Sequence, residues 1–326
     1  MNKNSPRLTI KDIAKLSGVG KSTVSRVING DIHVKQATRE LVEQVILQQQ
    51  FVPSKSARAM RGYSNKAIGI IVSRLDSTSE NQAISAILPL FYQRGFDPII
   101  VESQFDRKKV IEHLNMFAQR QIDGLIIFAF TGLEPDLLSE WQNKAVVIAR
   151  PFIDYHSICY DDHGAVMQLM GHFHHKLKHT NIAYIGIKEQ DHTTGQLRYQ
   201  AYQDFCQQHQ LAPYARLGEM NYHTGYQFAS ELIKSNRHGF TAIICATDLL
   251  ALGVNKYLQE NNITDITVGS IGQSKLLHFL FPNTISVHLG FNEAGILAAQ
   301  TLLMLLKKPF KPTQTIVPST LSIDSI

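Results

Sequence analysis

From residue 66 onward, short apolar runs alternate with amphipathic helical segments, and this alternation limits the possible folds more than any other feature of the chain. Strands that helices cover on both faces have this near-continuous apolar character. Nine runs fit the description: 67–73, 98–102, 124–130, 146–149, 157–160, 182–187, 242–246, 268–271 and 285–288. Nine strands are more than one sheet holds comfortably, so we predict an α/β body made of two doubly wound parallel sheets.

The positive charge of the chain is concentrated at its N-terminal end. Residues 1–63 contain 11 Lys or Arg against 4 Asp or Glu, whereas the rest of the chain contains 21 and 23. A small cationic module of this kind is suited to binding the phosphates of nucleic acid. The alternative is a basic leader that only keeps the protein in solution.

Residues 9–49 carry a helical pattern that argues against an idle leader. Thr9 and Asp12 have the spacing of a helix capping box, and the turn at 17–20 contains two glycines. We predict a first helix after Thr9, a second from Lys21 to about Ile28 and a third over 36–49. Two short helices across a glycine turn, closed by a third, form a helix-turn-helix unit. The residues expected to face its core are Ile10, Ile13, Ala14, Leu16, Val24, Val27, Ile28, Ala37, Leu41, Val42, Val45 and Ile46.

The second helix of this unit would enter the major groove of DNA. Lys21, Ser22 and Arg26 would then reach base edges or nearby phosphates. Arg26 is the best candidate for a bidentate contact with guanine, which is worth about 1–3 kcal/mol of discrimination. Hydroxyl side chains and turn amides more often hold phosphates. The predicted DNA contacts of the unit are Thr9, Lys21, Ser22, Thr23, Ser25, Arg26 and Asn29.

The segment LTIKDIAKLSGVGKSTVSRVING resembles the headpiece of the lac repressor family, and FVPSKSARAMRG resembles that family's hinge helix. The resemblance implies domains at 1–52, 53–63 and 64–326, with a hinge that orders on operator DNA in the minor groove. Met60 stands where the family usually has a leucine that wedges into a base step. Lys35 and Gly20 occupy two positions where the family usually has a capping residue, which should weaken helix starts by up to about 1 kcal/mol. The hinge residues that the resemblance assigns to DNA are Ser54, Lys55, Ala57, Arg58 and Met60.

The resemblance also implies that the body is similar to a periplasmic sugar-binding protein, with a ligand cleft between two lobes. Ligands of doubly wound sheets bind beyond the carboxyl ends of the strands. Carboxylates there suit sugar hydroxyls, and arginine forks suit phosphate. Arg198 and Asp248 match the family's recurrent ligand contacts, and other cleft positions follow from the resemblance or from strand ends. The full predicted set is Arg74, Glu80, Asn81, Phe130, Arg150, Asp161, Thr194, Arg198 and Asp248.

Segments such as VSRLDSTSEN, VVIARP and TTGQLR resemble the branch of this family that regulates trehalose operons. That resemblance implies a repressor released from its operator by trehalose 6-phosphate, with Arg74, Arg150 and Arg198 on the phosphate. Two alternatives stay open: another sugar or sugar phosphate as effector, and a corepressor response. A sugar sensor without DNA binding is a third.

Other chemistries find little support in the sequence. Four histidines at 172, 174, 175 and 179 lack a carboxylate or cysteine to complete a zinc set, and no nucleophile elbow or dinucleotide loop occurs. Cys159, Cys206 and Cys245 are expected to be reduced thiols. We therefore expect no enzyme, no metal and no cofactor. No apolar run reaches the roughly 18 residues of a membrane helix, so we expect a cytoplasmic protein. The tetramerising leucine heptad of one branch of the resembled family is not seen after TIVPSTLSIDSI, so we expect a homodimer, which would read a pseudo-palindromic operator.

Overall fold

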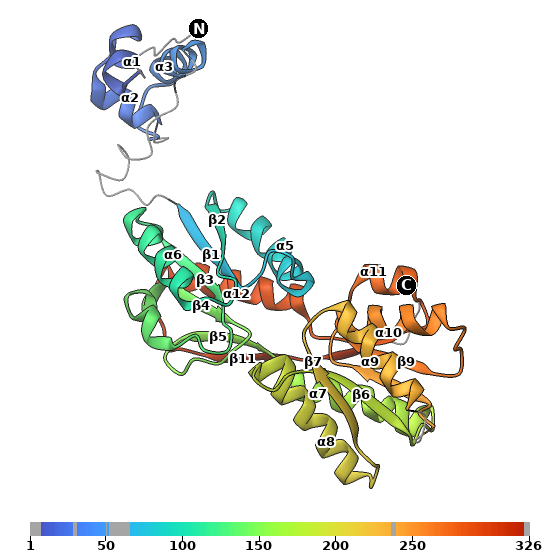
Figure 1. Cartoon of the computed structure of the whole chain (residues 1–326). Helices are drawn as coiled ribbons and strands as arrows, with labels where there is room; N and C mark the ends of the chain where they lie inside the picture. The colour runs from blue at the N-terminus through green and yellow to red at the C-terminus, as the bar shows by residue number, and fades with distance from the viewer. Residues whose placement is uncertain (1–7, 29–30, 50, 52–65, 236–238, 323–326) are drawn as a thin grey trace. The chain divides into compact units, whose positions relative to one another are not determined.

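The computed structural model describes residues 8–28, 31–49, 51, 66–235 and 239–322. The chain divides into two compact units, residues 1–65 and 66–326, which we call the headpiece and the body (Figure 1). The predicted hinge at 53–63 lies outside the described residues, so its helix stays a prediction. Among the described residues, no helix is long and apolar enough to cross a membrane.

The headpiece contains the three predicted helices: α1 (Ile10–Leu16), α2 (Lys21–Ile28) and α3 (Gln36–Gln48). Helix α1 begins at a capping box, in which the backbone N–H of Thr9 donates to the Asp12 carboxylate at 2.8 Å. Gly18 has φ +66°, a left-handed conformation that glycine adopts without strain, and it ends α1 before α2 begins. Helix α3 lacks a side-chain cap, because Lys35 stands at its N-cap position.

Nine of the twelve side chains expected to face the headpiece core do so: five are buried, and Ile10, Ile28, Val45 and Ile46 pack half-buried against them. The buried apolar side chains of this core, among the described residues, are Ile13, Ala14, Val24, Val27, Val42 and Phe51. The prediction was wrong for Leu16, which is 53% exposed, for Leu41, which is 46% exposed, and for Ala37, which is also exposed. Helices α1 and α2 are each about two turns long, so they cover only part of the apolar surface of α3.

The body contains two six-stranded sheets, as the alternation of apolar runs predicted. Every pairing of neighbouring strands is parallel except the antiparallel contact of β12 with β10, among the residues described. The first sheet has the order β11-β5-β4-β3-β1-β2, and its strands are β1 (Ala67–Val72), β2 (Asp97–Glu102), β3 (Gly124–Phe128), β4 (Ala145–Ile148), β5 (His156–Tyr160) and β11 (Gln314–Val317). The second has the order β12-β10-β9-β8-β6-β7, and its strands are β6 (Ile182–Ile187), β7 (Tyr214–Gly218), β8 (Ala242–Cys245), β9 (Thr267–Ile271), β10 (Ile285–His288) and β12 (Thr320–Ser322).

Three strands, β7, β11 and β12, were not predicted from the sequence. Each lies at the edge of a sheet, and most of their residues are half-buried or exposed. An edge strand needs no continuous apolar run, because one of its sides is uncovered.

Helices cover both faces of each sheet (Figure 1). On the first sheet, Ile68 and Ile70 of β1 pack with α5 and α12, whereas Ile71 packs with α6 on the opposite face. The helices of this lobe are α5 (Thr78–Tyr92), α6 (Arg107–Gln119), η1 (Pro135–Lys144) and α12 (Phe291–Leu305). Those of the other lobe are α7 (Asp162–Gly171), η2 (His172–Lys176), η3 (His192–Leu197), α8 (Arg198–Gln208), α9 (Tyr222–Lys234), α10 (Asp248–Glu260) and α11 (Lys275–Leu280).

The described chain crosses between the two lobes three times, after β5, after β10 and after β11. Lobe 1 therefore comprises 66–160 and 291–317, and lobe 2 comprises 162–288 and 320–322. Two of the crossings are joined by hydrogen bonds: the Ser319 hydroxyl donates to Asp161 at 3.2 Å, and the Gln168 amide donates to the Ser319 hydroxyl at 2.7 Å. Paired crossings of this kind allow lobes to rotate about a common hinge.

Candidate functional site

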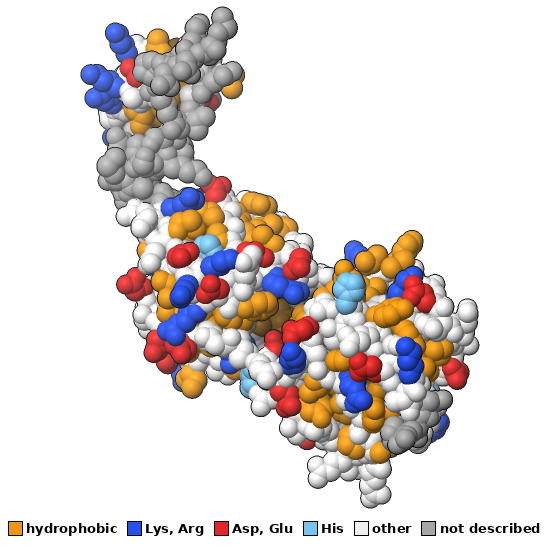
Figure 2. All heavy atoms as spheres, in the orientation of Figure 1, with side chains coloured by type: hydrophobic (Ala, Val, Ile, Leu, Met, Phe, Trp, Pro, Cys, Tyr) orange, Lys and Arg blue, Asp and Glu red, His pale blue; other side chains and the backbone are white. Residues whose placement is uncertain are grey.

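A cavity of about 840 Å³ lies between the two lobes of the body, where the carboxyl ends of the strands from both sheets face each other (Figure 2). Its lining residues follow strands of both lobes, from Ser73 after β1 to Asn292 after β10. This is the position at which doubly wound sheets bind ligands. Seven of the predicted site residues line the cavity: Arg74, Glu80, Asn81, Phe130, Thr194, Arg198 and Asp248.

The other two predicted residues, Arg150 and Asp161, are not among the residues that line the cavity. Asp161 caps α7 by accepting from the Gly164 amide at 2.9 Å, and it accepts from Ser319 at the crossing between lobes. Arg150 donates from Nη1 to the carbonyl oxygen of Phe130 at 2.8 Å, and its buried Nε has no partner among the described residues.

Arg198 and Asp162 form a buried ion pair in the lobe 2 wall. The Nε and Nη2 atoms of Arg198 each lie 2.7 Å from the same carboxylate oxygen of Asp162, and Nη1 donates to the carbonyl oxygen of Ala246. The side chains are only 5% and 3% exposed. Burial raises the pKa of Asp162, and the neighbouring Arg198 guanidinium opposes that rise. The pair fixes Arg198 at the start of α8 and leaves little of its charge uncompensated.

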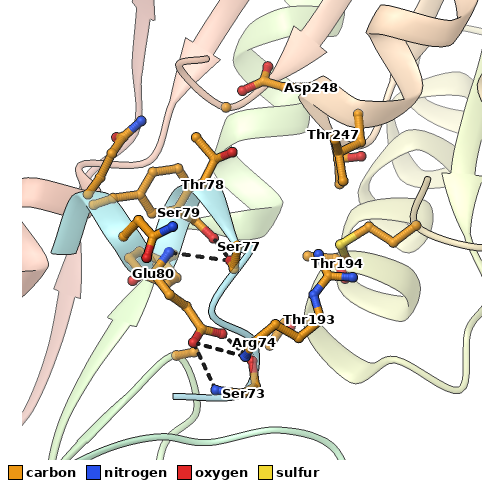
Figure 3. A pocket seen from close by; sticks show the side chains of 18 of the residues that line it. Ser73, Arg74, Ser77, Thr78, Ser79, Glu80, Thr193, Thr194, Thr247 and Asp248 are labelled. Atoms are coloured by element: carbon orange, nitrogen blue, oxygen red, sulfur yellow. Dashed lines mark hydrogen bonds between the residues drawn. The ribbon is translucent and has the colours of Figure 1, made fainter. Parts of the chain in front are cut away.

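Glu80 organises the loop that carries Arg74. Its carboxylate accepts from the backbone N–H of Ser73 at 2.8 Å, from the Ser73 hydroxyl, and from the backbone N–H of Arg74 at 3.5 Å (Figure 3). The residue is 9% exposed, and burial raises the pKa of its carboxyl while these hydrogen bonds lower it. Glu80 thus holds the chain immediately before the cavity in one conformation.

Arg74 extends into the cavity from lobe 1, toward Thr193 and Thr194 of lobe 2 (Figure 3). Its Nε lies 3.1 Å from a carboxylate oxygen of Asp76, a side chain that is 80% exposed. An ion pair with so exposed a partner is weak, so the guanidinium remains able to bind an anion. The hydroxyl of Thr194 is buried and has no partner among the described residues, so it is a further donor for such a ligand.

On the lobe 2 side, Asp248 is a half-buried carboxylate at the start of α10. It accepts from the Ser270 hydroxyl at 2.6 Å and from the Ser274 backbone N–H at 2.8 Å, and burial raises its pKa. A carboxylate held in this way can accept further hydrogen bonds from ligand hydroxyls, since each oxygen has two lone pairs.

Two aromatic pairs complete the lining. Phe105 and Phe130 meet edge to face at 5.7 Å between ring centroids, and Tyr160 and Phe291 do the same at 5.1 Å. Such rings offer apolar faces to the C–H surfaces of a sugar. Sequence reasoning missed Phe105, Tyr160, Phe291 and Asp162. Their signal was position alone, because each lies at or shortly after the end of a strand.

In the headpiece, helix α2 presents a polar face opposite its buried Val24 and Val27. Lys21, Ser22 and Arg26 are exposed, and Thr23 and Ser25 are half-buried. Figure 2 shows Lys and Arg side chains gathered on the headpiece surface. Asn29, Ser54, Lys55, Ala57, Arg58 and Met60 lie outside the described residues, so their predicted roles stay predictions.

The histidines that the sequence analysis considered as zinc ligands have other contacts. The Nδ1 atom of His174 lies 3.0 Å from the carbonyl oxygen of His179, and Nδ1 of His179 lies 2.8 Å from the Thr241 hydroxyl. No group of three or more His, Cys, Asp or Glu side chains is arranged to hold a metal ion in the described parts of the chain. The three cysteines are buried and unpaired, and burial raises the pKa of Cys159 to about 11.

Both the headpiece and the body are similar to parts of known proteins. The sequence model of "Bacterial regulatory proteins, lacI family" matches residues 9–54, and that of "Periplasmic binding protein-like domain" matches residues 171–324. The HTH-type transcriptional regulator TreR of Escherichia coli K12 is 48% identical over 97% of this chain and 99% of its own length. An HTH-type transcriptional repressor PurR of Histophilus somni is 26% identical over 94% of this chain and 95% of its own.

Solved structures agree with these sequence relatives. The trehalose repressor from Escherichia coli superposes with a TM-score of 0.76 at 43% identity, covering 79% of this chain and all of that one. A lac repressor dimer bound to operator and the anti-inducer ONPF has a TM-score of 0.87 and covers 98% of both chains, and at 22% identity it shows the fold alone.

A helix-turn-helix headpiece joined to a two-lobed body of the periplasmic-binding-protein type defines a class of bacterial transcriptional regulators. The chain belongs to the lacI family of bacterial regulatory proteins. It is a DNA-binding transcriptional regulator and not an enzyme, as the sequence predicted.

Proposed function

We propose that the protein represses an operon for trehalose uptake or use, and that trehalose 6-phosphate in the cavity releases it from the operator. The observation that carries this proposal is the 48% identity with TreR, which extends over 97% of the chain and so includes both units. The related Escherichia coli structure bears the name trehalose repressor. A regulator of this kind acts where the DNA is, which in a bacterium is the cytoplasm.

The chemistry of the cavity is compatible with a phosphorylated disaccharide. Its volume of about 840 Å³ falls in the range of about 300–1,000 Å³ that is usual for small-molecule sites. Asp248 and Thr194 supply hydrogen-bond partners for hydroxyls, and the aromatic pairs supply apolar faces. Of the two arginines that line the cavity, Arg74 has the less compensated charge, because its partner Asp76 is exposed whereas Arg198 is paired with buried Asp162. Arg74 is therefore the proposed phosphate ligand, with Arg150 and Arg198 adding positive potential.

On the DNA side, α2 would lie in the major groove with Arg26 on a guanine. In a homodimer, two headpieces would read the two halves of a pseudo-palindromic operator. Ligand binding would close the lobes about their crossings and change the spacing of the headpieces. A tenfold loss of operator affinity needs only about 1.4 kcal/mol of coupling.

The test begins with the duplex that the protein selects from a random pool, so that no operator need be assumed. Its dissociation constant is measured at fixed salt with trehalose 6-phosphate, trehalose, glucose 6-phosphate or no addition, because salt alone changes DNA affinity. We expect a rise of tenfold or more with trehalose 6-phosphate only. Arg74→Gln should abolish the response, whereas Arg216→Gln, which removes the same charge outside the cavity, should keep it.

Equal responses to all sugars, or none, would contradict trehalose 6-phosphate as the effector while leaving DNA binding intact. A fall in the dissociation constant would instead make the ligand a corepressor. A corepressor response is the second alternative that the sequence left open. The same titration distinguishes it from release, because the dissociation constant changes in the opposite direction.

A further inference from the structure

An ion pair between Arg26 and Asp31 lies at the C-terminal end of helix α2. The Nε atom of Arg26 lies 3.8 Å from Oδ2 of Asp31, which follows α2 at the start of the next turn. Arg26 is 66% exposed and Asp31 is 30% exposed. Two other acids of the described headpiece have different partners: Asp12 accepts from the Thr9 hydroxyl, and Glu40 accepts from the Gln36 amide.

Asp31 is held in place from several sides. Its backbone N–H donates to the carbonyl oxygen of Arg26 at 3.0 Å, and its own carbonyl oxygen accepts from Nη2 of Arg39 on α3 at 2.6 Å. Oδ1 of its carboxylate accepts from the His33 backbone N–H at 2.9 Å. One carboxylate oxygen is therefore used within the turn, and the other is the one that faces Arg26.

This geometry has a consequence for base recognition. An arginine reads guanine with two N–H groups that point in the same direction, toward O6 and N7. A carboxylate beside Nε restrains the rotation of the guanidinium and leaves the two terminal nitrogens for the base. An exposed ion pair of this kind adds little to folding stability, so its effect should be seen in DNA selection rather than in unfolding.

We infer that Asp31 is a positioning residue for Arg26, and that it sets how strictly the protein selects the base that Arg26 contacts. The inference rests on the contact between Arg26 and DNA proposed above. Asp31 also places a negative charge beside the DNA-binding surface, which opposes binding to any sequence. Only the first effect favours the correct site over others, because the second weakens binding to every sequence alike.

The experiment uses the full-length protein, its selected duplex and a set of duplexes that each carry one base-pair change. Arg26→Ala identifies the position that Arg26 reads, because discrimination at that position is lost. Asp31→Asn removes the charge but keeps an oxygen for the His33 amide, and Asp31→Ser keeps an acceptor in a smaller side chain. Glu40→Gln is the matched control, since it removes one negative charge from the same unit without touching Arg26.

We expect Asp31→Asn and Asp31→Ser to reduce discrimination at the Arg26 position by about three- to tenfold, and to leave the other positions unchanged. Glu40→Gln should change affinity for all duplexes alike. In the Arg26→Ala background, Asp31→Asn should have no effect on discrimination, which a merely structural role would not predict. Thermal unfolding of the headpiece should be the same in all of these proteins.

The inference is overturned if Asp31→Asn behaves like Glu40→Gln, or if its effect persists without Arg26. Loss of discrimination at every position together with early headpiece unfolding would show a structural role, and would also overturn it. If Arg26→Ala itself leaves every position unchanged, the proposed guanine contact fails, and the two failures are thereby told apart.

Discussion

The headpiece and the body of this protein build their binding surfaces in opposite ways. The described core of the headpiece has six buried apolar side chains from a segment of about 40 residues, and the face proposed to read DNA belongs to the single helix α2. The cavity of the body collects residues from Ser73 to Asn292, and they meet only because two sheets align their strand ends. The headpiece therefore builds its binding surface from residues close together in the sequence, on a small core that is easily destabilised. The body builds its site from residues far apart in the sequence, on two large and stable sheets.

The largest expected effect tests the fragility of the headpiece. Ile13 is fully buried in its small core, so Ile13→Ala should cost about 2–5 kcal/mol. A unit of this size has only a few kcal/mol of stability to lose, and DNA binding should disappear. Calorimetry should show the headpiece transition lost and the body transition unchanged. Leu16→Ala on the same helix is the control, because Leu16 is 53% exposed and should matter little.

The next effect tests the body through its buried ion pair. Arg198→Met leaves the Asp162 carboxylate buried without its partner, which should destabilise the body by about 3–5 kcal/mol. Adding Asp162→Asn removes the uncompensated charge and should recover part of the loss. The measurement is the unfolding transition of the body, with the headpiece transition as internal reference. A double variant no more stable than Arg198→Met would contradict the ion-pair explanation.

The same contrast explains what the sequence could predict. The helices of the headpiece follow from apolar spacing within a few residues, with a capping box at α1, and α1, α2 and α3 begin where these signals predicted. Leu16 and Leu41 were misplaced because periodicity shows which side of a helix is apolar, but not how far a short neighbour covers it.

In the body, nine strands were predicted from apolar runs, including the edge strand β2, and the three that were missed are edge strands with mixed sequences. The ends of the strands predicted where the cavity lies, but not which of two neighbouring residues lines it. Asp161 and Asp162 are adjacent in sequence, yet the first caps a helix at the hinge and the second lines the cavity. Only the φ and ψ angles of the crossing decide which of the two carboxylates turns inward, and neither residue type nor spacing encodes them.

A smaller effect concerns the pH dependence of the body. Burial raises the pKa of Glu80 above its ordinary value of 4.5, so the folded protein holds this proton more tightly than the unfolded chain does. Stability from this group is full below pH 4.5 and is lost as the pH rises through the raised pKa. Glu80→Gln should therefore flatten the body's stability against pH over that interval. Parallel curves for the two proteins, measured by thermal unfolding from pH 4 upward, would contradict this assignment.

The smallest expected effect concerns the N-terminal cap of helix α3 in the headpiece. Lys35 supplies no side-chain cap to α3, so Lys35→Ser should stabilise the headpiece by up to about 1 kcal/mol. Lys35→Ala removes the same charge without adding a cap and is the matched control. The headpiece transition should rise for serine and not for alanine, while the body transition stays constant. Equal shifts for the two variants would assign the effect to charge instead.

The central claim is that the cavity of the body and the DNA-reading helix of the headpiece are coupled. Linkage requires any effect of trehalose 6-phosphate on operator affinity to be matched by an equal effect of operator on trehalose 6-phosphate affinity. The most direct measurement is therefore calorimetric titration of the ligand into full-length protein, with and without the selected duplex. We predict that the duplex weakens ligand binding by the same factor, tenfold or more, by which the ligand weakens duplex binding. Ligand affinity that is identical with and without the duplex would contradict the claim.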